Sequence, residues 1–184
     1  MLSCVGLTNK LNKVQIMRCW LQGFLLCWFV LPLPAIADDA EILQLAREVI
    51  EKVRYGALIT VGQSGQPRSR IVDAFEPDKD FVIYVATKPN TRKVEQIKSN
   101  PRATLFYFDA EGRNYVSVMG KATLVDDLAT KQSMRRDTDS DRIYPNFPDD
   151  YLLIRVEPEA VEGLLPGYRG DRETWQPARV EFVR

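Results

Sequence analysis

The spacing of hydrophobic residues changes along the chain and separates predicted helices from predicted strands. Between Asp39 and Tyr55 these residues recur every three or four positions, which predicts an amphipathic helix capped by Asp39. Two short helices are expected at residues 92–98 and 128–136, each preceded by residues that commonly cap helices. The remaining pattern is that of strands, and it decides the fold class.

Hydrophobic runs bounded by turn residues predict β-strands over most of the remaining chain. The expected strands are residues 57–61, 68–75, 81–87, 103–109, 115–125, 151–156 and 160–164. The first two should form a hairpin, as should 103–109 and 115–125, where Gly120 indicates a bulge or a close backbone approach. The nearly continuous apolar run 81–87 predicts a central strand buried on both faces. The pattern therefore predicts a mainly β protein, a small closed antiparallel barrel with helices at its rim.

The first 37 residues have the layout of an export signal. A basic region up to Arg18 precedes the apolar run 19–33, and Ala35–Ala37 is an A-x-A cleavage pattern. We therefore expect a signal peptide over residues 1–37, with cleavage near Ala37, and an exported protein without a stable membrane span. A true start at Met17 would give a compact signal peptide. An uncleaved membrane anchor and a transit segment are the two alternatives.

Composition narrows the chemistry of the single domain expected over residues 38–184. The chain has no histidine, which excludes serine–histidine triads, histidine–zinc hydrolases and histidine-ligated haem. All three cysteines lie in the first 37 residues, so the domain has no disulfide and no cysteine metal site. The same segment holds three of the 25 basic residues and none of the 25 acidic ones, which leaves a net charge of −3. This charge disfavours nucleic-acid binding, and no metal site is expected.

The segment from Thr87 to Lys93 carries the first candidate binding chemistry, because it joins a buried strand to the start of a helix. Backbone N–H groups of a first helical turn attract anions, and Arg92 and Lys93 add two positive charges. A guanidinium fork together with a lysine point charge suits a phosphate monoester. The alternative is a capped helix whose basic residues face solvent.

Arg68 and Arg70 form the second candidate, because alternation along a strand places both on one face. Two arginines on one face need an anionic partner. If this face looks toward the helix start at Thr91, Arg70 adds a second charge to the same phosphate. Pairing with a carboxylate on a neighbouring strand is the alternative.

These units occur in an order that resembles the pyridoxamine 5'-phosphate oxidase-like split-barrel flavoproteins, in particular their general-stress-protein branch. The order is a G-x-P-x-x-R strand, an apolar strand ending in threonine, a T-R-K helix start, an N-P pair and a Y-V-S-V-x-G strand. In this chain the corresponding segments are residues 65–70, 81–87, 91–93, 100–101 and 115–120. The resemblance extends from about residue 57 to residue 164.

The resemblance implies a six-stranded antiparallel split β-barrel that forms a homodimer, with flavin mononucleotide (FMN) bound in the groove between the subunits. It places the cofactor's phosphate on Arg70, Arg92 and Lys93. The implied cofactor-binding set is Arg70, Ile71, Val72, Asp73, Thr87, Thr91, Arg92, Lys93 and Ser117. The flavin then carries the chemistry, and the sequence names no catalytic residue.

Two departures from the family pattern argue against the oxidation of vitamin B6. True pyridoxamine phosphate oxidases have a lysine where this chain has Phe75, and a C-terminal motif with a histidine that this chain lacks. We therefore expect a flavin-dependent oxidoreductase of an unidentified small-molecule substrate, and not a vitamin B6 oxidase. Two alternatives stay open. One is an exported, cofactor-free dimer that binds a ligand or partner, and the other is the same fold with a deazaflavin or another phosphorylated ligand.

Overall fold

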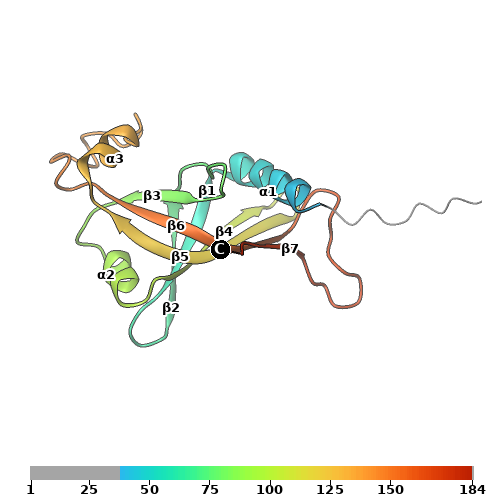
Figure 1. The fold of residues 1–184 in the computed structure, drawn as a ribbon. Coiled ribbons are helices and arrows are strands. Elements are labelled where there is room, and N and C mark those ends of the chain that lie inside the picture. The colour runs from blue at the N-terminus through green and yellow to red at the C-terminus, as the bar shows by residue number, and fades with distance from the viewer. Residues whose placement is uncertain (1–37, 184) are drawn as a thin grey trace, which may run out of the picture. The chain divides into compact units, whose positions relative to one another are not determined.

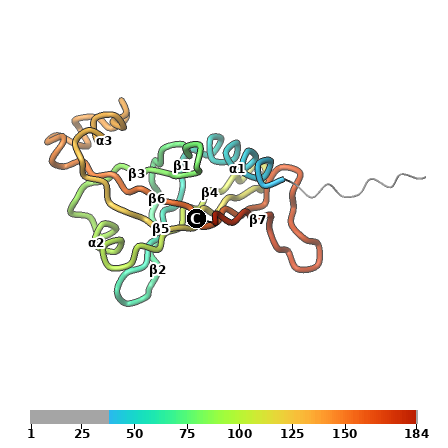
Figure 2. The backbone as a smooth tube through the Cα atoms, viewed as in Figure 1, coloured from blue at the N-terminus to red at the C-terminus, as the bar shows by residue number. Residues whose placement is uncertain are grey.

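The computed structural model describes residues 38–183. The predicted signal peptide and its cleavage site lie outside these residues. Figure 1 and Figure 2 show the path of the chain, whose elements are α1 (Asp39–Val53), β1 (Tyr55–Val61), β2 (Pro67–Asp73), β3 (Ile83–Thr87), α2 (Arg92–Ser99), β4 (Arg102–Asp109), β5 (Asn114–Val125), α3 (Leu128–Ser133), β6 (Leu152–Leu164) and β7 (Ala178–Glu181). Among the described residues, no helix is long and apolar enough to cross a membrane.

Within residues 38–183, seven antiparallel strands form one sheet in the order β2-β1-β4-β5-β6-β3, and β7 pairs with β6 beyond the end of β3. The mainly β, antiparallel fold with peripheral helices is thus confirmed. The sheet is not a closed barrel and has seven strands instead of six. Its two ends, β2 and β3, are joined by an isolated bridge between Ala74 and Val85, where a closed barrel would have a ladder of hydrogen bonds.

The strand β3 lies at one end of the strand order, so the prediction of a central strand was wrong. Its two faces are nevertheless covered by different layers. Ile83 and Val85 belong to the main core, whereas Tyr84 and Ala86 pack against a second cluster that contains Tyr151. The continuous apolar run therefore reflects layers above and below the strand, and not hydrogen-bonded neighbours on both sides.

One long strand, β6, replaces the two strands predicted at residues 151–156 and 160–164. Pro158 stays within it because the register with β5 shifts at this point, so that Glu159 has no partner position on β5. The carbonyl of Glu159 instead accepts a hydrogen bond from the backbone of Phe182, just beyond β7. The missing N–H of a proline is tolerated at such an irregularity.

Gly120 lies opposite this irregularity on β5. A Cβ atom at this position would lie 1.9 Å from the carbonyl oxygen of Glu157, so the predicted bulge and close backbone approach are confirmed. The strand β7, which pairs with the other edge of β6, was not predicted. Its four residues are too few to show a hydrophobic period.

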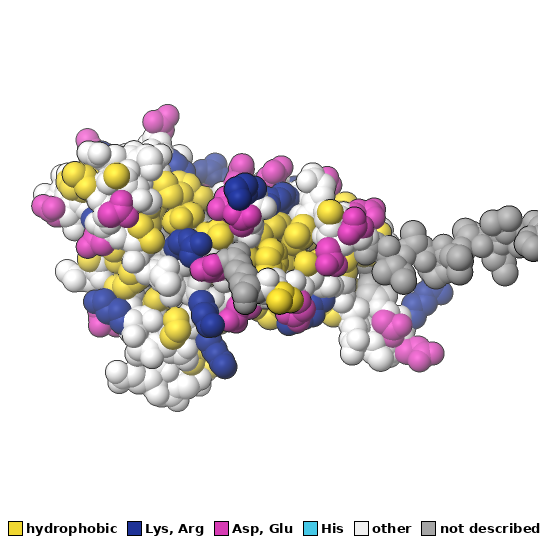
Figure 3. All heavy atoms as spheres, viewed as in Figure 1, with side chains coloured by type: hydrophobic (Ala, Val, Ile, Leu, Met, Phe, Trp, Pro, Cys, Tyr) yellow, Lys and Arg dark blue, Asp and Glu magenta, His cyan; other side chains and the backbone are white. Residues whose placement is uncertain are grey.

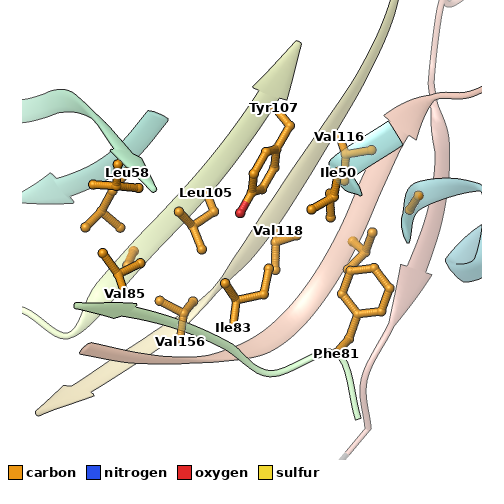
Figure 4. Packing of buried hydrophobic residues seen from close by; sticks show 14 of the residues in the cluster. Ile50, Leu58, Phe81, Ile83, Val85, Leu105, Tyr107, Val116, Val118 and Val156 are labelled. Carbon is orange, nitrogen blue, oxygen red and sulfur yellow. The ribbon is translucent and has the colours of Figure 1, made fainter. Parts of the chain in front are cut away.

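The main core joins the strands to one face of α1. Figure 4 shows its side chains converging from the strands and the helix; among them are Leu58, Ile83, Leu105, Val116, Val118, Val156 and Ile50. Burying each such aliphatic side chain contributes about 1.5–3 kcal/mol to stability. Tyr107 is also fully buried, its hydroxyl has no hydrogen-bond partner, and burial raises its pKa.

The helices begin close to the predicted positions and differ in their ends. Asp38 is the N-cap residue of α1, so Asp39 starts the helix and does not cap it. The helix α3 ends at Ser133, three residues earlier than predicted. Asp127 caps it by accepting a 2.9 Å hydrogen bond from the backbone N–H of Thr130.

Candidate functional site

Four basic side chains surround a hollow between β2 and the start of α2. Arg68 and Arg70 come from β2, and Arg92 and Lys93 come from the first turn of α2; with two hydroxyl residues they line a volume of about 550 Å³. None of the ion pairs in residues 38–183 includes any of these four cations. In Figure 3, basic side chains lie beside the β1–β2 hairpin. This cationic hollow thus holds positive charge without a negative partner from the described chain.

A second hollow of about 350 Å³ continues from the cationic hollow along β2, and we call it the β2 hollow. It shares Arg70, Thr91 and Lys93 with the cationic hollow. Its lining further includes the predicted residues Ile71, Val72, Asp73 and Thr87. The structure therefore brings together every predicted cofactor-binding residue except Ser117.

Ser117 lies in the middle of the sheet, away from the first turn of α2. It is paired with Phe106 of β4 and with Glu162 of β6. Successive pairing from Ile71 through Ala57 and Phe106 to Ser117 places all four on one face of the sheet. One chain alone therefore does not bring Ser117 into the two hollows.

A buried polar network holds Arg70, and sequence patterning did not predict it. Arg70 Nη1 donates hydrogen bonds to the Leu58 carbonyl at 3.0 Å and to Thr60 Oγ1 at 2.7 Å, and Nη2 donates to Gln96 Oε1 at 2.9 Å. Thr60, which is fully buried, donates to the same Gln96 oxygen at 2.7 Å. The available clue was a threonine within the apolar run of β1.

This network leaves Arg70 able to bind a ligand. A guanidinium has five N–H groups, and the three bonds described leave one on Nη2 and one on Nε. No carboxylate pairs with Arg70 or Arg68 among residues 38–183, so the alternative of a cross-strand ion pair does not hold. Arg70 is thus fixed by neutral groups and keeps its charge.

The positive charges of the cationic hollow repel one another. Burial lowers the pKa of Arg70, and the charges of Arg92 and Arg68 lower it further. Burial also lowers the pKa of Lys93, with the charge of Arg70 as the second cause. An anion placed among these groups would favour their charged forms. The hollow therefore has the electrostatics of an anion-binding site.

The first turn of α2 adds backbone donors to the hollow. Thr91 occupies the N-cap position, but its side chain makes no capping hydrogen bond. Its hydroxyl donates instead to the Lys88 carbonyl at 3.2 Å and lies 3.4 Å from the hydroxyl of Thr87. Thr91 thus occupies the cap position expected before this helix but does not cap it with its side chain. The first-turn N–H groups have no side-chain acceptor, which favours an anion there.

The segment that follows α3 forms a wall of the β2 hollow, although the sequence indicated no chemical role for it. Arg136 joins this segment to β2 by donating to the Asp73 carbonyl at 3.1 Å, and it pairs with Asp139 at 3.1 Å. Asp139 is buried and accepts a 3.0 Å hydrogen bond from the hydroxyl of Tyr151. Tyr144 lines the hollow, and burial together with Asp139 raises its pKa to about 12.

Metal ligands do not cluster in the described part of the chain. Within residues 38–183 there is no group of three or more histidine, cysteine, aspartate or glutamate side chains able to hold a metal ion. The hollows are instead characterised by cations, hydroxyl groups and free backbone donors. Their chemistry suits a phosphorylated organic ligand.

Residues 42–165 match the sequence profile of the family described as pyridoxamine 5'-phosphate oxidase. The matched segment is more than half of the chain. The chain belongs to this family. The match extends from α1 to the end of β6 and includes both hollows. It confirms the resemblance drawn from the motifs. No curated protein sequence matches the chain.

Several solved structures share the fold of this chain. General stress protein 26 from Bacillus anthracis str. Sterne is 23% identical, with 77% of this chain and 98% of that chain covered and a TM-score of 0.60. A protein related to general stress protein 26, from Clostridium acetobutylicum, is 18% identical, with 79% and 96% covered and a TM-score of 0.65. A pyridoxamine 5'-phosphate oxidase-related, FMN-binding protein from Nostoc punctiforme PCC 73102 is 17% identical, with 82% and 99% covered and a TM-score of 0.58. At these identities the likeness establishes the fold.

We predict that Lys93 titrates below the ordinary lysine value of 10.5 and that inorganic phosphate raises its pKa. A bound anion stabilises the ammonium form, so the two effects have opposite signs. Because the pKa is lower in the folded than in the unfolded state, the free energy of unfolding should rise as pH rises between the folded pKa and 10.5. Side-chain ¹⁵N NMR and urea unfolding across this pH range measure both effects.

Lys93→Met should remove the resonance and this part of the pH dependence, and Lys98→Met is the matched control on the same helix. A Lys93 midpoint at or above 10.5 without added anion would contradict the prediction. So would a midpoint that phosphate leaves unchanged.

Proposed function

We propose that the protein binds FMN in the two hollows and works as a flavin-dependent oxidoreductase on a small molecule. The observation that carries the proposal is the set of four cations without acidic partners, next to a hollow that runs along β2. Membership of the pyridoxamine 5'-phosphate oxidase family supports it. So does the fold shared with the Nostoc protein, which is described as FMN-binding.

The residues present fit this cofactor. The phosphate would lie in the cationic hollow, where Arg92, Lys93 and the two free N–H groups of Arg70 provide charge-assisted donors. The hydroxyl groups of Thr87 and Thr91 would contact the ribityl chain, and the backbone of residues 71–73 would run beside the ring. The volumes of about 550 and 350 Å³ are of the size expected for such a ligand.

Bound flavin supplies the electron transfer, and the protein supplies binding, orientation and electrostatics. Thr60 and Gln96 fix Arg70, which would hold the cofactor's phosphate beside β2. Ile143 and Tyr144 form part of the wall of the β2 hollow. We propose a substrate other than the vitamin B6 phosphates, because Phe75 replaces the expected lysine and the chain has no histidine.

We further propose that the protein is a homodimer that uses the exposed face of its sheet. Ile71 is 71% exposed and Phe108 is 54% exposed, and the Phe106 and Tyr115 rings on the same face have centroids 5.7 Å apart. An apolar face of this kind is typical of a protein interface. Ser117 lies on this face, so dimerisation provides a route by which Ser117 of one subunit approaches the site of the other.

Export with cleavage near Ala37 remains part of the proposal. It rests on the basic, apolar and A-x-A pattern of the first 37 residues. N-terminal sequencing of the protein recovered from the producing cells tests it. A mature chain that begins near Asp38 is expected, and an intact N-terminus would overturn it.

Removing two cations should weaken FMN binding. For Arg92→Ala combined with Lys93→Ala we expect a loss of roughly a hundredfold or more in affinity, since each charge-assisted hydrogen bond contributes about 1.5–3 kcal/mol. Fluorescence quenching of FMN measures the affinity, and far-UV circular dichroism checks the fold. Arg102→Ala combined with Arg172→Ala is the control, because it removes the same charge at exposed positions outside the hollow.

Unchanged affinity in the folded double variant would refute the phosphate position. A colourless protein that also fails to take up added FMN would refute the flavin proposal itself. The protein would then be a cofactor-free ligand-binding member of the fold, or one that binds a deazaflavin, and mass spectrometry of heat-released small molecules separates the two.

Phe108→Glu should convert the dimer to a monomer, because a carboxylate would be buried without a partner in the proposed interface. Light scattering after size-exclusion chromatography measures the mass. Leu128→Glu is the control, since Leu128 is also exposed but lies on α3. A wild-type protein that is monomeric at high concentration, or a Phe108→Glu variant that stays dimeric, would contradict this interface.

A further inference from the structure

A separate pocket of about 660 Å³ lies beside the end of β2, and Asp73 is the one proposed flavin-binding residue in its lining. It is bounded by the end of α1, the residues after β2, the start of β3 and the segment after α3. Its apolar lining includes Ile50, Ala74, Phe75, Val82, Tyr84 and Met134. Figure 3 shows a hydrophobic area in this region, between the α3 segment and α1. We call it the Phe75 pocket, and its volume suits a small organic ligand.

The two cations of the pocket are already neutralised by the protein. Arg54 forms an ion pair with Asp73 at 3.2 Å, and Arg136 forms one with Asp139 at 3.1 Å. The guanidinium of Arg136 also lies 4.0 Å from the centroid of the Phe75 ring, which fixes the ring in place. Neither cation therefore needs an anionic ligand.

Three carboxylates of the pocket, in contrast to these cations, have no charged partner within residues 38–183. Glu51, Glu76 and Asp137 line it and form neither a hydrogen bond nor an ion pair within residues 38–183. A fourth acidic residue, Asp78, is occupied, because its carboxylate accepts hydrogen bonds from two backbone N–H groups of the following turn. The pocket thus has a net negative rim above an apolar floor.

We propose that the Phe75 pocket binds a small organic cation with an apolar body, such as an amine. The ammonium group would lie among the three carboxylates, and the apolar body would cover Phe75 and its neighbours. Apolar walls around a negative rim concentrate the negative potential inside a cleft, which attracts cations and repels anions. Burial of the apolar body adds the hydrophobic contribution that an inorganic cation lacks.

The Phe75 pocket adjoins the β2 hollow, because Asp73, Arg136 and Thr138 line both. An amine in this pocket therefore borders whatever occupies the β2 hollow, as a substrate or second ligand would. The proposal rests on the pocket itself and does not require flavin. Amine binding is therefore expected in the absence of flavin, which separates this proposal from the flavin site.

Three probes of one shape test the charge preference: phenylbutylamine, phenylbutanol and phenylbutanoate. Binding to the full chain is measured by calorimetry at low salt, and ¹H–¹⁵N NMR shift changes locate the site. We expect the amine to bind roughly tenfold more tightly than the alcohol, the carboxylate to show no binding, and added salt to reduce this preference. Shift changes should centre on residues 73–76 and 134–138.

Glu76→Gln combined with Asp137→Asn should lower amine affinity by roughly threefold to tenfold and leave alcohol affinity unchanged. Both side chains are exposed, so these variants should fold. The control is Glu173→Gln, which removes an exposed carboxylate in the loop before β7. Equal binding of the three probes, an affinity that the double variant does not change, or shift changes elsewhere on the molecule would each overturn the proposal.

Discussion

Arg70 is half-buried without a carboxylate beside it, and this constraint shapes the site. Two oxygens of β1 and one of α2 accept its hydrogen bonds, so neutral groups hold the guanidinium while its charge stays available. A carboxylate in place of Gln96 would neutralise that charge. The hydrogen bonds that Arg70 and Thr60 donate to Gln96 join the β1–β2 hairpin to α2, which places Arg92 and Lys93 opposite β2. The anion-binding properties of the hollow depend on this link.

The end of β2 lies between two neighbouring cavities. The β2 hollow and the Phe75 pocket lie on either side of Asp73, and Arg136 contacts the backbone of β2 between them. The two cavities have opposite electrostatic character, one with unpaired cations at its far end and the other with unpaired carboxylates. A phosphorylated ligand and an organic cation would therefore bind in adjacent cavities. The buried Asp139, held by Arg136 and Tyr151, keeps the separating segment in place.

The exposed face of the sheet connects these cavities to the proposed assembly. Ile71 belongs both to this apolar face and to the lining of the β2 hollow. A second copy packed on the face would therefore cover the hollow as well as the apolar side chains. In the proposed dimer Ser117 would approach the hollow of the other subunit, because within one chain it lies on a different part of the sheet.

The sequence by itself determined the strand and helix types, the β1–β2 and β4–β5 hairpins, the Gly120 contact and the β2 and α2 residues that line the hollows. These features follow from local periodicity, turn residues and short motifs, which act over a few positions. Tertiary structure decided the edge position of β3, the continuity of β6 and the pairing of β7, because long-range hydrogen bonds leave no local pattern. It also decided which groups contact each charge: Arg70 donates hydrogen bonds to Thr60 and Gln96, and no sequence feature links these residues. For the same reason the Phe75 pocket, which combines four distant segments, is visible in the folded chain alone.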